Sequence, residues 1–133
     1  MIHDDLIEFL SNVPPFQFLD EKTLSSLAGS LSMDFYPKDT VILKQNGKVS
    51  EYLRIIKKGG VKVSIQTDEG EDIVVDYRGD GDNFGLWSII DQNTQKTTVI
   101  AVDDTVCYLV PKELVLKLLD TNAIFTEYFL KSH

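Results

Sequence analysis

The sequence predicts a mainly β domain, a small antiparallel barrel or jelly roll, with helices at both ends of the chain. From about Met33 to Val110, short apolar or alternating segments are separated by frequent turns. Before and after this region, apolar residues recur at helical spacing. The 133 residues, 43% hydrophobic and 26% charged, suit one soluble folded unit. We therefore treat 1–133 as a single domain.

Two amphipathic helices are expected within about 4–32. The first spans 4–12 and ends before Pro14-Pro15, because proline cannot continue a helix. The second follows Asp20, a side chain that suits the N-cap, and carries apolar residues at helical spacing up to Leu31. Both helices are expected to pack against a larger unit.

The β-rich region covers about 33–110. The strongest hairpin signal is the turn Asp68-Glu69-Gly70-Glu71 between two strand-like segments. A glycine-containing loop over 79–85 leads into a short helix, which a polar turn at 91–94 ends. The expected strands include 40–43, 52–56, 61–65, 73–77, 97–102 and 105–110, and the expected short helix is 86–90.

Two more helices are expected over about 112–131. Pro111 suits the first position of a helix, and a break is expected at 120–122. Because the printed sequence is still apolar near its end, we expect a module of a longer polypeptide, with a natural short protein as the alternative.

Composition argues against several classes of protein. The net charge of −8 disfavours a nucleic-acid partner. No apolar run is long enough to cross a bilayer, and the first residues do not resemble a signal peptide. The single cysteine, Cys107, lies in an apolar run and is expected to be buried and structural, in agreement with a reducing, cytoplasmic location.

The segment from Gly79 to Ala101 is the strongest functional signal. A glycine-containing loop that enters a helical turn can hold a phosphate with its backbone N–H groups. The chain contains the motifs Tyr36-Pro37-Lys38-Asp39-Thr40-Val41-Ile42, Leu53–Ile56 with Gly59, Val61-Lys62-Val63, Gly79-Asp80-Gly81-Asp82-Asn83-Phe84-Gly85, and Asp104-Thr105-Val106-Cys107-Tyr108-Leu109-Val110-Pro111. These motifs and the order of elements resemble the cyclic nucleotide-binding domain family, which implies an eight-stranded antiparallel jelly roll, or double-stranded β-helix, with N- and C-terminal helices.

The resemblance also implies a ligand site with two departures from the family. Members that bind cyclic AMP or cyclic GMP have a glutamate after Phe-Gly for the ribose and a later arginine for the cyclic phosphate. Leu86 and Gln95 occupy these positions here, so tight binding through the usual contacts is not expected. The candidate ligand-binding residues are Phe84, Gly85, Leu86, Trp87, Ser88, Gln95, Lys96, Thr97 and Thr98.

Two side chains of the cassette, by which we mean residues 84–98, have two interpretations each. Trp87 either stacks on a planar ligand or, as we favour, fills the core between the short helix and the roll. Lys96 either replaces the missing arginine or, as we favour, is a solvated lysine, because alternation along an extended segment would point it away from Gln95. Arg54 and Arg78 lie outside the cassette and are expected at the surface. A nucleotide or another small anion is the expected ligand.

The leading hypothesis is a regulatory or sensory domain without catalytic, metal or cofactor sites. The end of the roll and Phe125-Thr126-Glu127-Tyr128-Phe129 resemble a bacterial branch in which this module precedes CBS and putative nucleotidyltransferase domains. The resemblance also implies that the 85–90 segment is coupled to the helices over 112–131.

Other functions are kept as alternatives. One is a vestigial interdomain or homodimerisation module that uses the C-terminal helices, with Leu114, Leu118 and Phe129 as its apolar face. A cupin-like enzyme is disfavoured, because its metal would need histidines and only His3 and His133 are present. A transcription factor would need a recognition helix beyond the roll.

Overall fold

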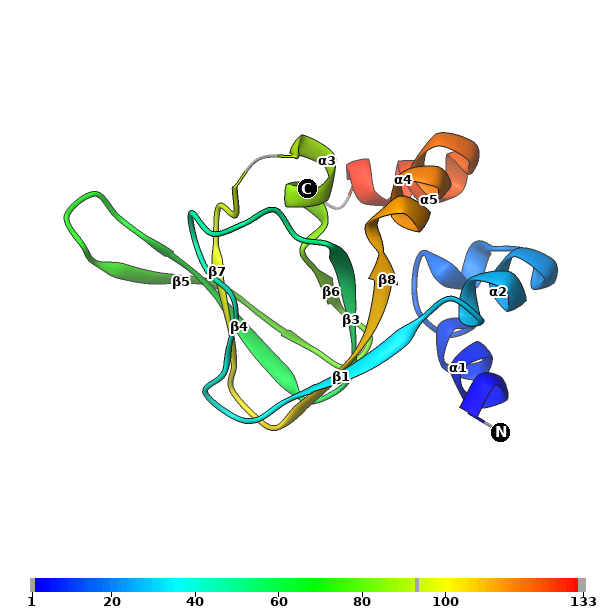
Figure 1. The fold of residues 1–133 in the computed structure, drawn as a ribbon, viewed down its shortest axis with the longest axis horizontal. Helices are drawn as coiled ribbons and strands as arrows, with labels where there is room; N and C mark the ends of the chain where they lie inside the picture. Colours follow the sequence, from blue (N-terminus) through cyan, green and yellow to red (C-terminus); the bar gives the residue numbers. More distant parts are fainter. Residues whose placement is uncertain (1, 93, 132–133) are drawn as a thin grey trace.

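The computed structural model describes residues 2–92 and 94–131 and shows a β-roll with helices gathered on one side (Figure 1). The helices are α1 (Ile2–Leu10), the 3-10 helix η1 (Phe16–Phe18), α2 (Glu21–Ala28), α3 (Leu86–Asp91), α4 (Lys112–Thr121) and α5 (Ala123–Lys131). The strands are β1 (Ser32–Tyr36), β2 (Val41–Leu43), β3 (Tyr52–Lys58), β4 (Gly60–Gln66), β5 (Asp72–Gly79), β6 (Asn83–Phe84), β7 (Thr98–Ala101) and β8 (Thr105–Pro111).

The strands form two four-stranded antiparallel sheets, as the expected jelly roll requires. One sheet has the order β1-β8-β3-β6 and the other the order β2-β7-β4-β5. Within them, Leu53 pairs with Val110 and Val63 with Val99. Non-consecutive strands are therefore neighbours, so residues of the cassette meet loops that are distant in the sequence.

Two hydrophobic cores explain why β8 is apolar along most of its length. Cys107 and Leu109 face the interior between the two sheets, whereas Tyr108 and Val110 face the helices. Side chains of a strand alternate between the faces of its sheet, so a strand covered on both faces needs apolar residues throughout. Cys107 is buried, as expected, and burial raises the pKa of its thiol to about 12.

The N-terminal helices confirm the sequence prediction in outline. The Asp20 carboxylate accepts a hydrogen bond from the Thr23 backbone N–H at 2.7 Å, so Asp20 is the N-cap of α2. This hydrogen bond lowers the pKa of Asp20. Leu31 lies beyond α2 and is half-buried between the helix and β1.

Several boundaries differ from those expected. The sequence analysis missed η1 and the two-residue strand β6, because neither is long enough to show a periodic pattern. Pro111 is the last residue of β8 and the N-cap of α4, one position before the helix. In the expected turn over 91–94, Asn93 lies outside the described residues, as does His133.

The alternative in which Leu114, Leu118 and Phe129 form an apolar docking face disagrees with the burial of these side chains. Leu118 and Phe129 are buried in the core on the helix side of the roll, and Leu114 is half-buried against it. The face that the helical spacing marks therefore packs within the domain. Exposed apolar residues of α5 are Ile124 and Leu130 instead.

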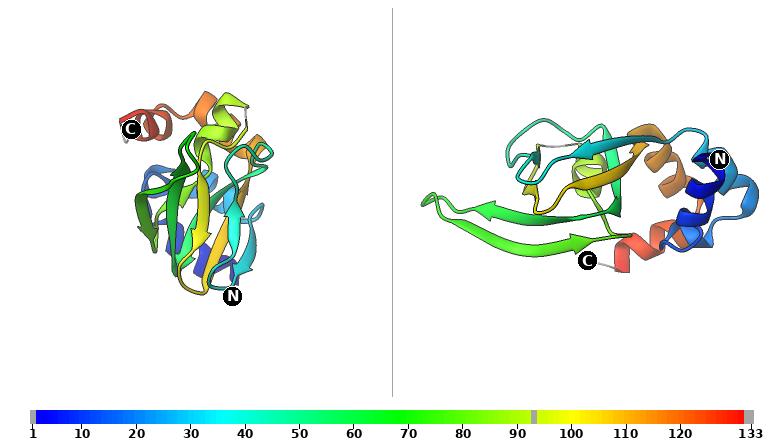
Figure 2. Two further views of the ribbon diagram at one scale, coloured as in Figure 1. Left: turned by 90° about the vertical axis from the view of Figure 1, so that its left-hand side faces the viewer. Right: turned by 90° about the horizontal axis from the view of Figure 1, so that it is seen from below.

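The β4–β5 hairpin projects from the roll on the side opposite the N-terminal helices (Figures 1 and 2). β5 is the edge strand of its sheet, and Val74, Val75 and Tyr77 are exposed. The β4–β5 register shifts between Val63 and Ser64. Such a bulge twists an edge strand and hinders pairing with another chain.

None of the helices within residues 2–92 and 94–131 combines the length and apolarity needed to cross a bilayer.

Candidate functional site

A cavity of about 310 Å³ lies between the inner face of the β2-β7-β4-β5 sheet and the segment that contains β6 and α3. Its size is at the lower end of the range for small-molecule sites. Apolar side chains from several strands and α3 form much of its wall. These are Leu43, Val63, Phe84, Leu86 and Val99.

Gly85 brings the cassette close to the start of β3. Its φ of +95° lies in the left-handed region, which residues with a Cβ rarely adopt. A Cβ at this position would lie 3.2 Å from the carbonyl oxygen of Tyr52. Upstream, the Asp82 carboxylate accepts a hydrogen bond from the Gly79 N–H at 2.8 Å and so stabilises the loop. The glycine motif therefore sets the path of the backbone into α3.

Leu86, the first residue of α3, gives the pocket an apolar wall where the family's ribose contact would be. Its side chain is 3% exposed and also packs in the core on the helix side. A ribose hydroxyl buried against it would find no acceptor on this side chain, which is unfavourable. Leu86 thus packs in the core and offers the cavity no charged or hydrogen-bonding side chain.

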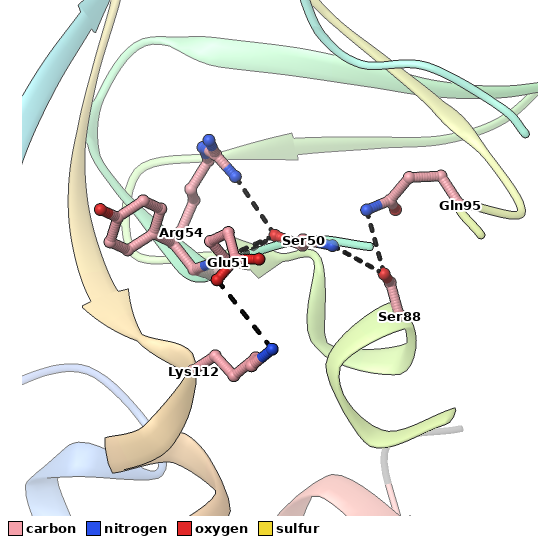
Figure 3. A network of polar contacts seen from close by, with 7 residues as sticks. Ser50, Glu51, Arg54, Ser88, Gln95 and Lys112 are labelled. Atoms are coloured by element: carbon pink, nitrogen blue, oxygen red, sulfur yellow. Dashed lines mark hydrogen bonds and ion pairs between the residues drawn. The ribbon is translucent and has the colours of Figure 1, made fainter. Parts of the chain in front are cut away.

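Gln95 connects α3 with the loop between β2 and β3. Its side-chain amide nitrogen donates to the carbonyl oxygen of Lys48 at 3.2 Å and to Ser88 Oγ at 3.1 Å. Ser88 Oγ also accepts a hydrogen bond from the Ser50 N–H at 2.9 Å, and Figure 3 shows this network. The Gln95 backbone is bound as well, since its N–H donates to Gly47 O and its carbonyl accepts from Asn46 N–H.

The same loop also contacts the first residue of α4. Glu51 and Lys112 form an ion pair with an N–O separation of 4.0 Å, and the Lys112 N–H donates to the Glu51 carbonyl at 3.0 Å (Figure 3). Ser50 and Glu51 are adjacent in the sequence. A continuous set of contacts therefore extends from Gln95 through Ser50 to α4.

Eight of the nine candidate residues from the sequence line the cavity. These are Phe84, Gly85, Leu86, Trp87, Ser88, Gln95, Lys96 and Thr97. Thr98 is not part of the wall, and its Oγ1 accepts a hydrogen bond from the Gln45 N–H at 3.0 Å. The structure places the other eight together, while their role in binding a ligand stays a prediction.

The expectation of a solvated Lys96 agrees with the exposure of its side chain, but the alternation argument behind it does not apply. Strand β7 begins only at Thr98, so residues 95 and 96 are not in a regular strand. Lys96 lines the cavity together with Gln95, although its side chain is 73% exposed. Its ammonium group lies 3.6 Å from the Asp91 carboxylate.

The expectation that Arg78 is a surface residue is also wrong. Arg78 is half-buried and lines the cavity, and its guanidinium contacts Asp76 at 3.1 Å and the Asn83 carbonyl at 2.9 Å. The hairpin register could have revealed this position, because Arg78 pairs with the buried Val61. Paired residues of neighbouring strands lie on the same face of the sheet.

Arg54 contacts the loop between β2 and β3 through a polar cluster with Tyr36 and Ser50. Its Nε donates to the Tyr36 hydroxyl at 2.8 Å, and its Nη1 donates to Ser50 Oγ at 3.4 Å. The guanidinium carbon is also 5.9 Å from the centroid of the Tyr36 ring. Arg54 is therefore half-buried and supports the Ser50 loop, contrary to the expected surface position.

Trp87 does not fill the core, since it is 39% exposed. It lines the cavity and also a neighbouring apolar groove between α3, α4 and α5. The other residues of the groove are Ile90, Leu116, Leu119, Asp120, Thr126, Phe129 and Leu130. The outer side of α3 is thus in contact with the C-terminal helices.

No group of three or more potential metal-ligating His, Cys, Asp or Glu side chains occurs within the described residues. The site is made instead of an apolar wall, amide and hydroxyl groups, and two cations that each contact a carboxylate.

Comparisons with known proteins agree with this architecture. The family model for the "Cyclic nucleotide-binding domain" matches residues 33–122. The cGMP-dependent protein kinase egl-4 of Caenorhabditis elegans is 30% identical over 100 residues, which are 74% of this chain and 13% of that protein. The chain therefore spans about an eighth of the length of such relatives.

Two solved structures are similar over nearly the whole chain. The regulatory subunit of a cAMP-independent protein kinase A from Trypanosoma brucei is 25% identical, with a TM-score of 0.77, covering 98% of this chain and 52% of that one. The corresponding Trypanosoma cruzi subunit, described as bound to guanosine, is 25% identical with a TM-score of 0.76, covering 98% and 50%. With the matched family model and the eight-stranded roll, these findings show that the chain belongs to the cyclic nucleotide-binding domain family.

Proposed function

We propose that this domain senses a small ligand within a larger signalling protein, and that it does not bind cAMP or cGMP through the family's two charged contacts. The observation that carries the proposal is the chemistry at two pocket positions. Leu86 is apolar and buried, and both amide N–H groups of Gln95 are used within the protein. Neither residue supplies a charge to a cyclic nucleotide.

The energetic consequence is large compared with ordinary binding differences. Charge-assisted hydrogen bonds contribute about 1.5–3 kcal/mol each. The loss of two such contacts corresponds to a weakening of at least about a hundredfold. The T. brucei relative supports the proposal, because it is described as cAMP-independent and a variant with three substitutions is described as bound to cAMP.

The proposed ligand class rests on the side chains that line the pocket and on one relative. Nucleotides and other small anions stay predicted ligands, with Arg78 and Lys96 as the cations that line the pocket. A nucleoside-like ligand is supported by the T. cruzi relative described as bound to guanosine.

Coupling to an output is proposed to run through α3 and the Ser50–Glu51 loop. α3 lies between the cavity and the groove formed with α4 and α5. Glu51 contacts Lys112 at the start of α4. A ligand that binds one arrangement of α3 better than another would shift the position of the C-terminal helices.

Isothermal titration calorimetry with cAMP and cGMP tests the proposal. The double variant Leu86→Glu, Gln95→Arg supplies both charged groups and is expected to bind at least about a hundredfold more tightly than the unmodified chain. The double variant Leu86→Met, Gln95→Leu, which adds neither a charge nor a hydrogen-bonding group, is the control and should show no gain. An unmodified chain that binds cAMP or cGMP as tightly as the charged variant would contradict the proposal.

The identity of the parent protein is a separate proposal from the sequence resemblance. We infer a bacterial signal-transduction protein in which CBS and putative nucleotidyltransferase domains follow this module, in the cytoplasm and without catalysis by this domain. The reading frame that encodes residues 1–133 tests it directly. A vestigial packing or dimerisation module is the alternative, and it predicts no thermal stabilisation by any nucleotide or nucleoside.

A further inference from the structure

Gln95 presents the opposite hydrogen-bonding character to the arginine that it replaces. We infer that the pocket contacts an uncharged hydrogen-bond donor at this position, such as a hydroxyl of a nucleoside sugar, and selects against a phosphate there. The inference rests on the proposed function, because it assumes that a ligand occupies this cavity. It follows from the hydrogen bonds of the Gln95 side chain and from the ion pairs that Arg78 and Lys96 form with carboxylates.

The orientation of the Gln95 amide is determined by its partners. The atom 3.2 Å from the Lys48 carbonyl oxygen must be the nitrogen, because a carbonyl oxygen can only accept. The second N–H of the same nitrogen is directed to Ser88 Oγ at 3.1 Å. An amide nitrogen has two N–H groups, so Gln95 has no donor left for a ligand.

The remaining polar atom of Gln95 is its carbonyl oxygen, Oε1. This atom has no hydrogen-bond partner among residues 2–92 and 94–131. In the same part of the chain, no fully buried side-chain nitrogen or oxygen lacks a partner, so Oε1 remains accessible. Gln95 as a whole is 4% exposed and is part of the cavity wall, so we take Oε1 to be the part of this side chain that a ligand in the cavity reaches.

The cations around the cavity do not supply the hydrogen-bond donor that Gln95 lacks. The two cations in its wall contact carboxylates, Arg78 with Asp76 at 3.1 Å and Lys96 with Asp91 at 3.6 Å. A phosphate close to Oε1 would place two electron-rich oxygens together and lose its hydrogen bonds to water. A neutral hydroxyl or N–H group would instead donate to Oε1.

Matched ligand pairs test the inference on the unmodified chain. Calorimetry compares adenosine, guanosine, cytidine and uridine, each with its own 3′,5′-cyclic monophosphate. The members of a pair share base and ribose and differ at the phosphodiester. At least one nucleoside is expected to bind about tenfold or more tightly than its cyclic monophosphate. This comparison does not depend on the folding of any variant.

Gln95→Arg is the diagnostic substitution, and Gln17→Arg, the same change at an exposed position of η1 outside the cavity wall, is the matched control. The Gln95 variant should reverse the preference within the pair, whereas the Gln17 variant should leave it unchanged. A preference of the unmodified chain for the cyclic monophosphate overturns the inference, as does an unchanged ratio in a folded Gln95→Arg variant. Binding of no nucleoside overturns it too, but leaves intact the proposal that the usual charged contacts are absent. Tight binding of cAMP by the unmodified chain would contradict both.

Discussion

At the scale of single residues, burial changes the chemistry of side chains that are ordinary in the sequence. Cys107 illustrates this, because it lies inside the roll between two apolar residues of β8. Its thiolate is disfavoured by desolvation, which raises the pKa from 9.0 to about 12. Reactive cysteines need an electropositive and accessible environment, and Cys107 has neither a high exposure nor a low pKa.

We predict that Cys107 reacts slowly with thiol reagents in the folded protein near pH 8. A pKa of about 12 leaves about one thiol in ten thousand ionised at that pH. Absorbance after addition of Ellman's reagent measures the rate, with the urea-unfolded chain as the control. Fast labelling of the folded chain would contradict the buried position.

The same pKa shift predicts a loss of stability at high pH. Because the folded-state pKa is raised, this thiol contributes its full stability below pH 9.0 and loses it as pH rises toward about 12. Urea unfolding of the unmodified chain and of Cys107→Ala across this range measures the effect. The difference in unfolding free energy between the two proteins should shrink with rising pH.

At the scale of elements, a few close contacts join segments that are far apart in the sequence. Gly85 allows α3 to begin against the end of the Ser50 loop. Thr105, at the start of β8, accepts a hydrogen bond from the Gly60 N–H at 3.1 Å through Oγ1 and so connects the two sheets. The single proton of this hydroxyl has two carbonyl acceptors in reach, Asp103 at 2.8 Å and Gly60 at 3.1 Å. The first contact is possible because Gly85 has no Cβ, and the second depends on the hydroxyl of Thr105.

Gly85→Ala should destabilise the domain by more than Gly70→Ala. Both glycines have a positive φ, +95° and +84°, so alanine carries a similar backbone cost of about 1 kcal/mol at each. At Gly85 the added Cβ also crowds the Tyr52 carbonyl at 3.2 Å, whereas nothing lies within 4 Å at Gly70. Urea midpoints of the two variants provide the comparison, and equal midpoints would refute the close approach.

Thr105→Val should lower the free energy of unfolding by about 1–3 kcal/mol. Valine has the shape of threonine but leaves the buried Gly60 N–H without its hydroxyl acceptor. Thr105→Ser keeps that group and should recover most of the loss. Chemical denaturation measures all three proteins, and a valine variant as stable as the original would show that the hydroxyl is dispensable.

At the scale of the whole molecule, stability is expected to be uneven. β8 is central in its sheet and lies between two hydrophobic cores, whereas β5 is an exposed edge strand on the projecting hairpin (Figure 2). The cassette lies between these regions and contacts α4. Because local stability falls from β8 to β5, the ligand site lies next to elements that can move without unfolding the core.

Hydrogen exchange measured by mass spectrometry should resolve this gradient. Amides of β8 should exchange only with global unfolding, and amides of β5 should exchange faster by several orders of magnitude. Ligand binding at the cavity should protect α3 and the start of α4 together. Protection of α3 without any change over 112–121 would contradict the proposed coupling.

Much of the fold and part of the site could be predicted from the sequence. Local periodicity indicated the long strands and helices, and glycine positions with Phe84 marked the cassette. The chemical consequence of Leu86 and Gln95 was also visible, since it depends on residue type alone. Short elements such as β6 left no periodic signal.

The tertiary structure alone decided which residues share the cavity and which partners they have. Periodicity shows which side of an element is apolar but not which distant element covers it, so Leu118 and Phe129 looked like a docking face and are core residues. Arg78 reaches the cavity through its strand register, and the Gln95 amide binds a loop 47 positions away in the sequence. The sequence by itself determined that residues 86 and 95 carry no charge. Packing decided that Gln95 retains an acceptor there, because its donors are used within the fold.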